Sequence, residues 1–317
     1  MFLSVIIPTR NRARHLEGVL SSLRGQTHGA ESFEVLVVDN GSTDNTREVC
    51  ESYRTLLPGF QYLYESQPGL HVGRHLGMKR AQADILVYAD DDIEAFPTWL
   101  EGIAEPFGDE QVVLVGGKNL PKFELEPPVW ILRMWEKDRQ GGRMIPYLSI
   151  LDLGDEFKVI NPYYVFGCNF SIRKSVLLEA GGFHPDAMPP ELIRYRGDGE
   201  THLARHIIEH DYKAIYHPKA SVHHLVPGER MTEEYFCRRA FAQGVSDSYS
   251  VIRSGKHPST WRYTMAKLNR SLLGALGISS RFLKFRASYW KGFEFHQLEV
   301  HKDGALLDWV ARGSYIE

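Results

Sequence analysis

The sequence predicts an α/β protein with a mostly parallel sheet that carries helices on both faces. Short apolar runs rich in β-branched residues alternate with segments whose apolar positions recur at helical spacing, and turn sequences separate them. Several of these runs end directly at polar or acidic residues, and ligands bind beyond the carboxyl ends of the strands in such sheets. The 317 residues suffice for one large domain or two smaller ones.

Strands and helices are expected to alternate through the first half of the chain. Each expected strand is a short apolar run, and these runs cover residues 3–7, 34–38, 60–64 and 84–89. The helical segments between them cover residues 12–24, about 43–54 and 70–82.

The rest of the chain is less regular and ends in helical sequence. Further strands are expected at residues 111–115, 213–216 and 220–224, and a helix at 200–209. Composition shifts place soft boundaries near residues 115 and 229. We therefore expect two halves of one domain, 1–115 and 116–228, followed by a helical and basic region at 229–317.

Composition argues against several classes of protein. No apolar run approaches the roughly 18 to 20 residues of a membrane-spanning helix. The three cysteines lack CxxC spacing, which argues against a disulfide scaffold or a cysteine-rich zinc module. Basic residues follow the first apolar run instead of preceding it, so we expect no signal peptide and a cytoplasmic location. The net charge of −3 gives no reason to expect nucleic acid.

Three adjacent carboxylates, Asp90, Asp91 and Asp92, follow the strand expected at 84–89. Such neighbours repel one another unless a cation neutralises them. Mg²⁺ and Mn²⁺ take oxygen ligands, usually carboxylates together with the phosphates of a substrate. The alternative is a solvated acidic turn, and the position after a buried strand favours the metal site.

Two further side chains suggest nucleotide binding. Asp39 closes the second strand, where a carboxylate can accept a hydrogen bond from a ring N–H or a ribose hydroxyl; a turn residue is the alternative. Arg74 lies on an expected helix, and a guanidinium suits a pyrophosphate or a base edge. An exposed helix arginine is the alternative for Arg74.

The acidic loop before residue 201 offers two candidate bases. Glu200 could take a proton from an attacking hydroxyl, or it could serve as a helix cap, for which Asp198 is the better candidate. His223 and His224 end a later strand, and each is either a structural histidine or a metal ligand. Trp130 and Trp135 are either sugar-stacking platforms or core residues.

Seven ordered motifs carry a family resemblance. They are SVIIPTRNR (4–12), VLVVDNGSTDNT (35–46), GLHVGRHLGMKRA (69–81), ILVYADDD (85–92), FGCNFSIRKSVLLEAGGF (166–183), GDGETHLARHI (197–207) and SVHHLVPGERMTEEYF (221–236). Their order and spacing resemble the inverting nucleotide-sugar glycosyltransferases of family 2, which have the GT-A fold. The resemblance covers residues 3 to about 245.

The resemblance implies roles on the donor side of a site. Pro8, Thr9 and Arg10 match the first nucleotide loop, Asp39 the residue that reads uracil or another base, and Arg74 an arginine that supports the nucleotide. Asp90 and Asp92 match the DxD motif that holds Mn²⁺ or Mg²⁺ on the donor diphosphate, and Asp91 lines the donor sugar. His224, with His223 as the competing choice, matches a histidine that completes the metal site in some members.

On the acceptor side, the resemblance assigns Asn169 and the Gly181–Gly182–Phe183 turn. Alignment on the following helix places Glu200 where many members have an aspartate base, and Asp198 lies two residues earlier. The residue after Arg74 also departs from the family pattern, because His75 stands where an asparagine is usual.

The resemblance implies a metal-dependent inverting glycosyltransferase. It would move a sugar from a nucleoside-diphosphate sugar, with UDP-sugars favoured, to a saccharide or lipid-linked acceptor in surface polysaccharide or glycoconjugate synthesis. A sugar-phosphate nucleotidyltransferase is the alternative enzyme. The segment 248–293 has nine basic and no acidic residues. This suggests peripheral contact with the inner face of a membrane, or a non-catalytic membrane- or polyanion-binding protein, and a solvated basic helix face is the alternative.

Overall fold

The computed structural model describes residues 1–137, 141–255 and 280–316, and its centre is an eight-stranded sheet. The strand order is β10-β12-β6-β11-β4-β1-β2-β3. Their bounds are Leu3–Thr9 (β1), Phe33–Asp39 (β2), Gln61–Tyr64 (β3), Ile85–Ala89 (β4), Val112–Gly116 (β6), Lys158–Ile160 (β10), Asn169–Arg173 (β11) and Lys213–Tyr216 (β12).

The sheet is mixed, which refines the expected mostly parallel arrangement. The four strands β3, β2, β1 and β4 run parallel, and so do β6 and β12. Strand β11 lies between β4 and β6 and runs antiparallel to both, and β10 runs antiparallel to β12. The parallel register aligns Thr9 with Asp39, so β1 and β2 end at the same edge of the sheet.

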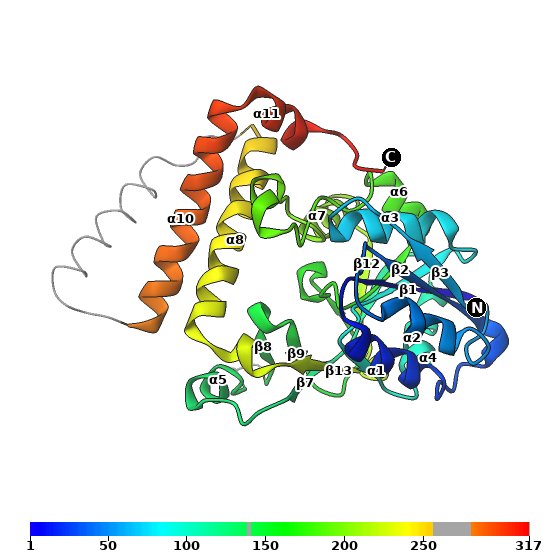
Figure 1. Cartoon of the computed structure of the whole chain (residues 1–317). Helices are drawn as coiled ribbons and strands as arrows, with labels where there is room; N and C mark the ends of the chain where they lie inside the picture. Colours follow the sequence, from blue (N-terminus) through cyan, green and yellow to red (C-terminus); the bar gives the residue numbers. More distant parts are fainter. Residues whose placement is uncertain (138–140, 256–279, 317) are drawn as a thin grey trace.

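Helices cover both faces of this sheet (Figure 1). Those of the first half are Ala13–Leu23 (α1), Thr46–Tyr53 (α2), Leu70–Arg80 (α3) and Trp99–Ala104 (α4). Later helices are Val129–Met134 (α5), Lys174–Glu179 (α6), Thr201–Glu209 (α7), Glu233–Arg253 (α8), Arg281–Lys302 (α10) and Gly304–Ala311 (α11).

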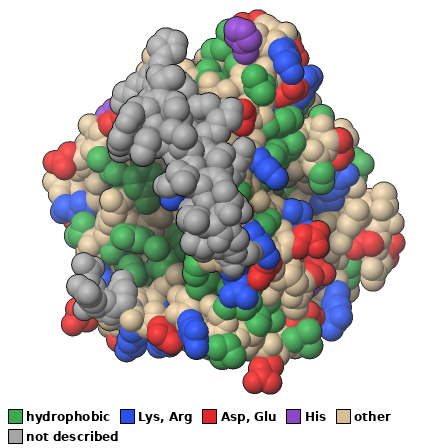
Figure 2. Space-filling model, turned by 90° about the vertical axis from the view of Figure 1, so that its left-hand side faces the viewer, with side chains coloured by type: hydrophobic (Ala, Val, Ile, Leu, Met, Phe, Trp, Pro, Cys, Tyr) green, Lys and Arg blue, Asp and Glu red, His purple; other side chains and the backbone are tan. Residues whose placement is uncertain are grey.

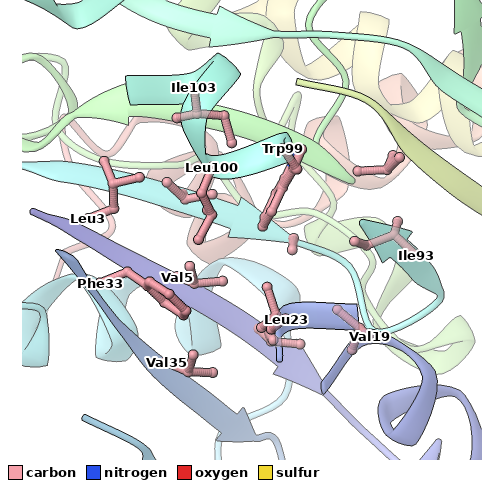
Figure 3. Close-up of a cluster of buried hydrophobic side chains, with 14 of the residues drawn as sticks. Leu3, Val5, Val19, Leu23, Phe33, Val35, Ile93, Trp99, Leu100 and Ile103 are labelled. Carbon is pink, nitrogen blue, oxygen red and sulfur yellow. The ribbon is translucent and has the colours of Figure 1, made fainter. Parts of the chain in front are cut away.

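The central strands are mostly apolar because they are covered on both faces. All seven residues of β1 and all seven of β2 are buried. Figure 3 shows part of this core, in which side chains of β1 and β2 pack with those of α1 and α4, among them Val19, Leu23, Trp99, Leu100 and Ile103. This core holds the carboxyl ends of β1 and β4 in fixed positions.

A second, five-stranded sheet has the order β5-β13-β7-β9-β8. Its strands are Ile93–Ala95 (β5), Asn119–Phe123 (β7), Arg143–Ile145 (β8), Ile150–Asp152 (β9) and Val222–Val226 (β13). Strand β5 follows the three aspartates directly and pairs with β13, so residues near 92 and 224 are brought together.

The long helices α8 and α10 run side by side in the same direction (Figure 1). Gly244 and Gly292 permit this approach, because a side chain at either position would overlap the backbone of the other helix at Tyr289 or Phe241. No helix in the described parts of the chain is both long enough and apolar enough to cross a bilayer. Much of the basic segment expected at 248–293, namely residues 256–279, lies outside the described residues.

Candidate active site

A cavity of about 550 Å³ opens beyond the carboxyl ends of β1 and β4. Helix α3, the loop before β11, strand β13 and helix α8 supply its other walls. The cavity brings together ten of the residues expected from sequence: Pro8, Thr9, Arg10, Arg74, Asp90, Asp91, Asp92, Asp198, Glu200 and His224.

Asp91 is buried and tied to the end of β1. One of its oxygens accepts from Thr9 Oγ1 at 2.7 Å, and the other accepts from Arg12 Nη1 at 2.7 Å. Burial and the neighbouring Asp92 raise the pKa of Asp91, Arg12 and Thr9 lower it, and the resulting pKa is about 6. The Thr9 and Arg12 contacts lock the acidic loop onto the first strand.

Asp92 is buried among cations. Its Oδ2 accepts from Arg12 Nη1 at 2.9 Å and from Arg230 Nη2 at 2.8 Å, and Arg230 lies in the short 3₁₀ helix Gly228–Met231. Burial alone would raise the pKa of Asp92, but His224, Arg230 and Arg12 together hold that pKa well below its ordinary value. Asp92 is therefore held as a carboxylate.

Asp90, Asp92 and His224 form a candidate metal site, with one ligand atom from each lying within 4.8 Å of the others. Asp92 Oδ1 is buried without a hydrogen-bond partner among the described residues and lies 3.3 Å from His224 Nε2. Burial and the nearby Asp92 raise the pKa of Asp90, a repulsion that a bound cation removes. The neighbouring His223 lies against the ring of Phe96, so the geometry selects His224.

Arg74 on α3 connects this acidic group to Glu200. Its side chain is only 2% exposed. Nη1 lies 3.3 Å from Glu200 Oε1, and Nη2 lies 3.8 Å from Asp90 Oδ1 and donates to the carbonyl of Gly167 at 3.1 Å. One buried guanidinium thus fixes the separation between the candidate metal ligands and the candidate base.

The two candidate bases have different surroundings. Asp198 is buried, and its carboxylate accepts from His184 Nδ1 and Ser250 Oγ, both at 2.6 Å, and from Arg205. Although burial raises it, these partners lower the pKa of Asp198 below its ordinary value. Glu200, 24% exposed and contacting Arg74, keeps oxygen surface toward the cavity.

Four of the expected site residues are not among the described residues that line the cavity. Asp39 is buried at the end of β2, where it accepts from Tyr62 and from the backbone N–H of Ser42. Any contribution of Asp39 to base recognition therefore requires a rearrangement of these bonds or contact through its neighbour Asn40, which does line the cavity.

The other three, Asn169, Gly182 and Trp130, are engaged elsewhere. Asn169 bonds to Trp99, to Asn119 and to the carbonyl of residue 220 beneath the cavity. Gly182, at φ +85°, packs against His75 and Ile316, and Trp130 packs in an aromatic cluster with Phe236 and Phe285. Their expected part on the acceptor side stays a prediction, and in this geometry it would have to be indirect.

Three functional positions were not singled out from sequence. Arg12 and Arg230 both bind Asp92, yet each stands inside a motif where an exposed loop arginine is the ordinary interpretation. Gly167 precedes β11, and a Cβ there would overlap Glu200 Oε1 and approach Arg74 Nη2 to 2.6 Å. A glycine two residues before a buried strand was the available signal for this close approach.

Comparison with known proteins identifies the chain's family. Residues 4–179 match the profile of the family described as Glycosyl transferase family 2. The chain belongs to this family. This family assignment favours glycosyl transfer over the alternatives of a nucleotidyltransferase and of a binding-only protein.

Two similar proteins come from Haloferax volcanii. The glycosyltransferase AglE is 36% identical over 117 residues, which are 37% of this chain and 38% of AglE. A glucosyl-dolichyl phosphate glucuronosyltransferase is 23% identical over 257 residues, covering 78% of this chain and 76% of that protein. The match to AglE is thus confined to well under half of either protein.

A solved structure shares the fold. The mannosyltransferase PcManGT from Pyrobaculum calidifontis, in complex with GDP-Man and Mn²⁺, aligns with 96% of this chain and 75% of its own, with a TM-score of 0.57 and 18% identity. The expected GT-A architecture is confirmed, with mixed sheets and C-terminal helices.

Proposed function

We propose that this family 2 enzyme transfers a sugar from a nucleoside-diphosphate sugar, with inversion at the anomeric carbon, and requires a divalent cation. The observation that carries the proposal is the connection through Arg74. It places a carboxylate–histidine metal set and a cavity-facing carboxylate, Glu200, on opposite sides of one guanidinium.

The metal set is suited to Mn²⁺ or Mg²⁺. Asp90 and Asp92 offer carboxylate oxygens and His224 offers an imidazole nitrogen. Asp92 Oδ1 accepts no hydrogen bond from the described residues, so this oxygen is left for a cation. A cation held there would offset the charge that develops on the departing nucleoside diphosphate. Arg12 and Arg230 keep Asp92 ionised and oriented for this task.

Glu200 is the proposed general base, with Asp198 in a supporting role. Glu200 takes the proton of an acceptor hydroxyl while that oxygen forms a bond to the anomeric carbon and the bond to the diphosphate breaks. Attack from the face opposite the leaving group inverts the anomeric configuration. Asp198, bonded to His184, Ser250 and Arg205, holds the loop that carries Glu200.

UDP is the proposed nucleotide, because the family resemblance matches Asp39 to the residue that reads uracil or another base. GDP is the competing choice, since the structural neighbour PcManGT was solved with GDP-Man. A screen must therefore include both nucleotides.

The proposed acceptor is a lipid-linked saccharide that carries phosphate. The cavity wall formed by α8 includes Arg239, whose Nε has no hydrogen-bond partner within the described residues and whose charge lowers the pKa of Asp186, another residue of the cavity lining. The Haloferax relative described as a glucosyl-dolichyl phosphate glucuronosyltransferase is named for a lipid-linked phosphate acceptor. Surface polysaccharide or glycoconjugate synthesis is the process that would use such an acceptor.

Peripheral contact with an anionic membrane surface, at the cytoplasmic face, is part of this proposal. Leu125, Val129, Leu132 and Phe282 are exposed near α5 and the start of α10, on a side of the molecule where Figure 2 shows apolar side chains among basic ones. Lys284 is among the basic residues here, although Arg281 and Lys284 also pair with Glu233. Flotation with anionic vesicles tests this contact, and failure to float would remove it without affecting the transfer proposal.

Release of nucleoside diphosphate from a panel of donors tests the transfer proposal. With Mn²⁺ present, the wild-type chain should hydrolyse one UDP- or GDP-sugar slowly even without acceptor, and the anomeric proton of the released sugar should show inversion by NMR. Asp92→Asn should abolish this release. Retention of configuration, or equal release after chelation of metal, would overturn the mechanism.

A further inference from the structure

A second cluster of metal-ligating side chains lies outside the cavity, between the ends of α6 and α7. Glu179 is the last residue of α6, His206 lies in the last turn of α7, and His210 follows that helix directly. The two histidines are four residues apart and therefore lie on one face of the helical turn. None of the three lines the donor cavity.

The three side chains converge on one point. Glu179 Oε1 lies 3.6 Å from His206 Nε2 and 3.7 Å from His210 Nε2. The imidazole rings lie 4.1 Å apart between centroids, and one ligand atom from each residue falls within 4.8 Å of the others. His206 Nε2 is buried and has no hydrogen-bond partner among the described residues.

Neighbouring groups orient the ligand atoms. His210 Nδ1 donates to the carbonyl of His206 at 2.9 Å, which leaves the lone pair on Nε2 directed at the cluster. Tyr212 donates its hydroxyl to Glu179 Oε2 at 3.4 Å, so Oε1 is the oxygen left for the cluster. Hydrogen bonds from neighbouring groups that orient the ligand side chains are typical of metal sites in proteins.

We propose that Glu179, His206 and His210 bind a divalent transition-metal ion of the Zn²⁺ type. Two imidazoles and one carboxylate are the ligand types that Zn²⁺ and its neighbours Co²⁺, Ni²⁺ and Cu²⁺ prefer, whereas Mg²⁺ prefers oxygen ligands. Three protein ligands leave a fourth position, which water fills in a tetrahedral site.

Such an ion would join the end of α6 to the end of α7. Helix α7 begins directly after Glu200, and Glu179 precedes the Gly181–Gly182 turn. The ion would therefore stabilise α7 at its C-terminal end, while the proposed base Glu200 lies at the other end of this helix, beside the cavity. This inference does not depend on the proposed transfer reaction.

Calorimetric titration with Zn²⁺ tests the site. The full chain is used after chelation and desalting, with Asp92→Asn in every sample so that the cavity site is disabled. We expect one Zn²⁺ per chain, no binding of Mg²⁺, and a visible d–d absorption band when Co²⁺ is used. Adding His206→Gln should weaken Zn²⁺ binding by more than about tenfold.

Two further variants complete the experiment. His210→Gln changes a more exposed ligand, 44% exposed, and should give the same loss even where His206→Gln folds poorly. His301→Gln, an exposed histidine at the end of α10, is the matched control and should leave affinity unchanged. Absence of Zn²⁺ binding in the Asp92→Asn chain, or equal affinity in the His210→Gln chain, would overturn the proposal.

Discussion

The two main walls of the cavity are built in different ways. The strand-end wall carries Thr9, the last residue of β1, and the three aspartates that follow β4. Asp91 bonds to Thr9 and Arg12, Asp92 bonds to Arg12, and Asp90 lies 3.8 Å from Arg74. The opposite wall comes from one face of α8, which presents Tyr235, Arg239, Gln243 and Ser246 at intervals of three or four residues.

From this difference we infer that the strand-end wall carries out the transfer step and that the α8 wall recognises the acceptor. On the strand-end wall Asp91 and Asp92 have partners that fix their directions, which suits groups that must act on a common diphosphate and sugar. On the α8 wall the Nε of Arg239 has no hydrogen-bond partner among the described residues, which suits recognition of a variable acceptor. We expect substitutions on the first wall to lower transfer rate, and those on the second to weaken acceptor affinity.

The largest effect is expected for Glu200→Gln. Loss of the proposed base should lower the transfer rate about 10³-fold while nucleotide affinity stays within twofold, because general-base catalysis contributes roughly 10²–10⁴-fold. Initial rates and calorimetric nucleotide binding measure the two quantities. Glu209→Gln, at the far end of the same helix, is the matched control. Full activity of the Glu200→Gln enzyme would remove Glu200 from its role.

Gly167→Ala should have the next largest effect. The added methyl would overlap Glu200 Oε1 and crowd Arg74, so the base must move, and a displacement of this size costs about 10²-fold in rate. Gly29→Ala, where the new methyl meets nothing within 4 Å, is the control. Steady-state kinetics measure the rates of the two variants, and equal rates would contradict this prediction.

Acidification should lower the free energy of unfolding through buried histidines behind the strand-end wall. Burial lowers the pKa of His71 to about 4, of His75 to about 3 and of His202 to about 4. Between these values and the ordinary 6.5 the unfolded chain binds more protons, so stability falls as pH falls through that window. Each histidine should remove roughly 2 kcal/mol between about pH 7 and about pH 5.

Urea unfolding at the two pH values measures this change. His71→Gln should flatten the pH dependence by one histidine's share, whereas the exposed His301→Gln should not. An unfolding free energy that is the same at both pH values would contradict the assignment of neutral buried histidines.

Arg239→Gln should have the smallest effect of the four and should act on the acceptor alone. Loss of one charge-assisted contact to a phosphate raises acceptor KM about tenfold, with kcat and donor affinity little changed. Arg238→Gln is the matched control, since Arg238 is exposed and pairs with Glu234. A fall in kcat at unchanged acceptor KM would show that Arg239 acts in the transfer step. It would contradict the proposal that the α8 wall acts in acceptor binding alone.

The strand-end wall could be predicted from sequence because its signals are local. The expected strands at 3–7, 34–38 and 84–89 lie within two residues of β1, β2 and β4, and the acidic triplet follows the last of them. The expected helices at 12–24 and 70–82 correspond to α1 and α3 within two residues at each end.

The rest of the site depends on tertiary contacts that no local pattern reveals. The sequence pattern does not show that β11 inserts antiparallel between β4 and β6. The three-residue strands of the second sheet are too short to give a periodic hydrophobic pattern. The polar residues of α8 have the same sequence pattern as those of any solvent-facing helix, so the sequence alone does not reveal the cavity beside them. Trp130 illustrates the converse, since an aromatic side chain offered as a sugar platform packs in a core cluster.

The most direct test of the central claim is calorimetric binding of nucleoside diphosphate with and without Mn²⁺. Wild type and Asp92→Asn should be compared with UDP first and then GDP, each after chelation and again after addition of Mn²⁺. We expect one of these nucleotides to bind tightly to wild type only when Mn²⁺ is present. In the variant, Mn²⁺ should no longer increase the affinity for that nucleotide. Equal nucleotide affinity in all four conditions would contradict a donor site built on Asp90, Asp92 and His224.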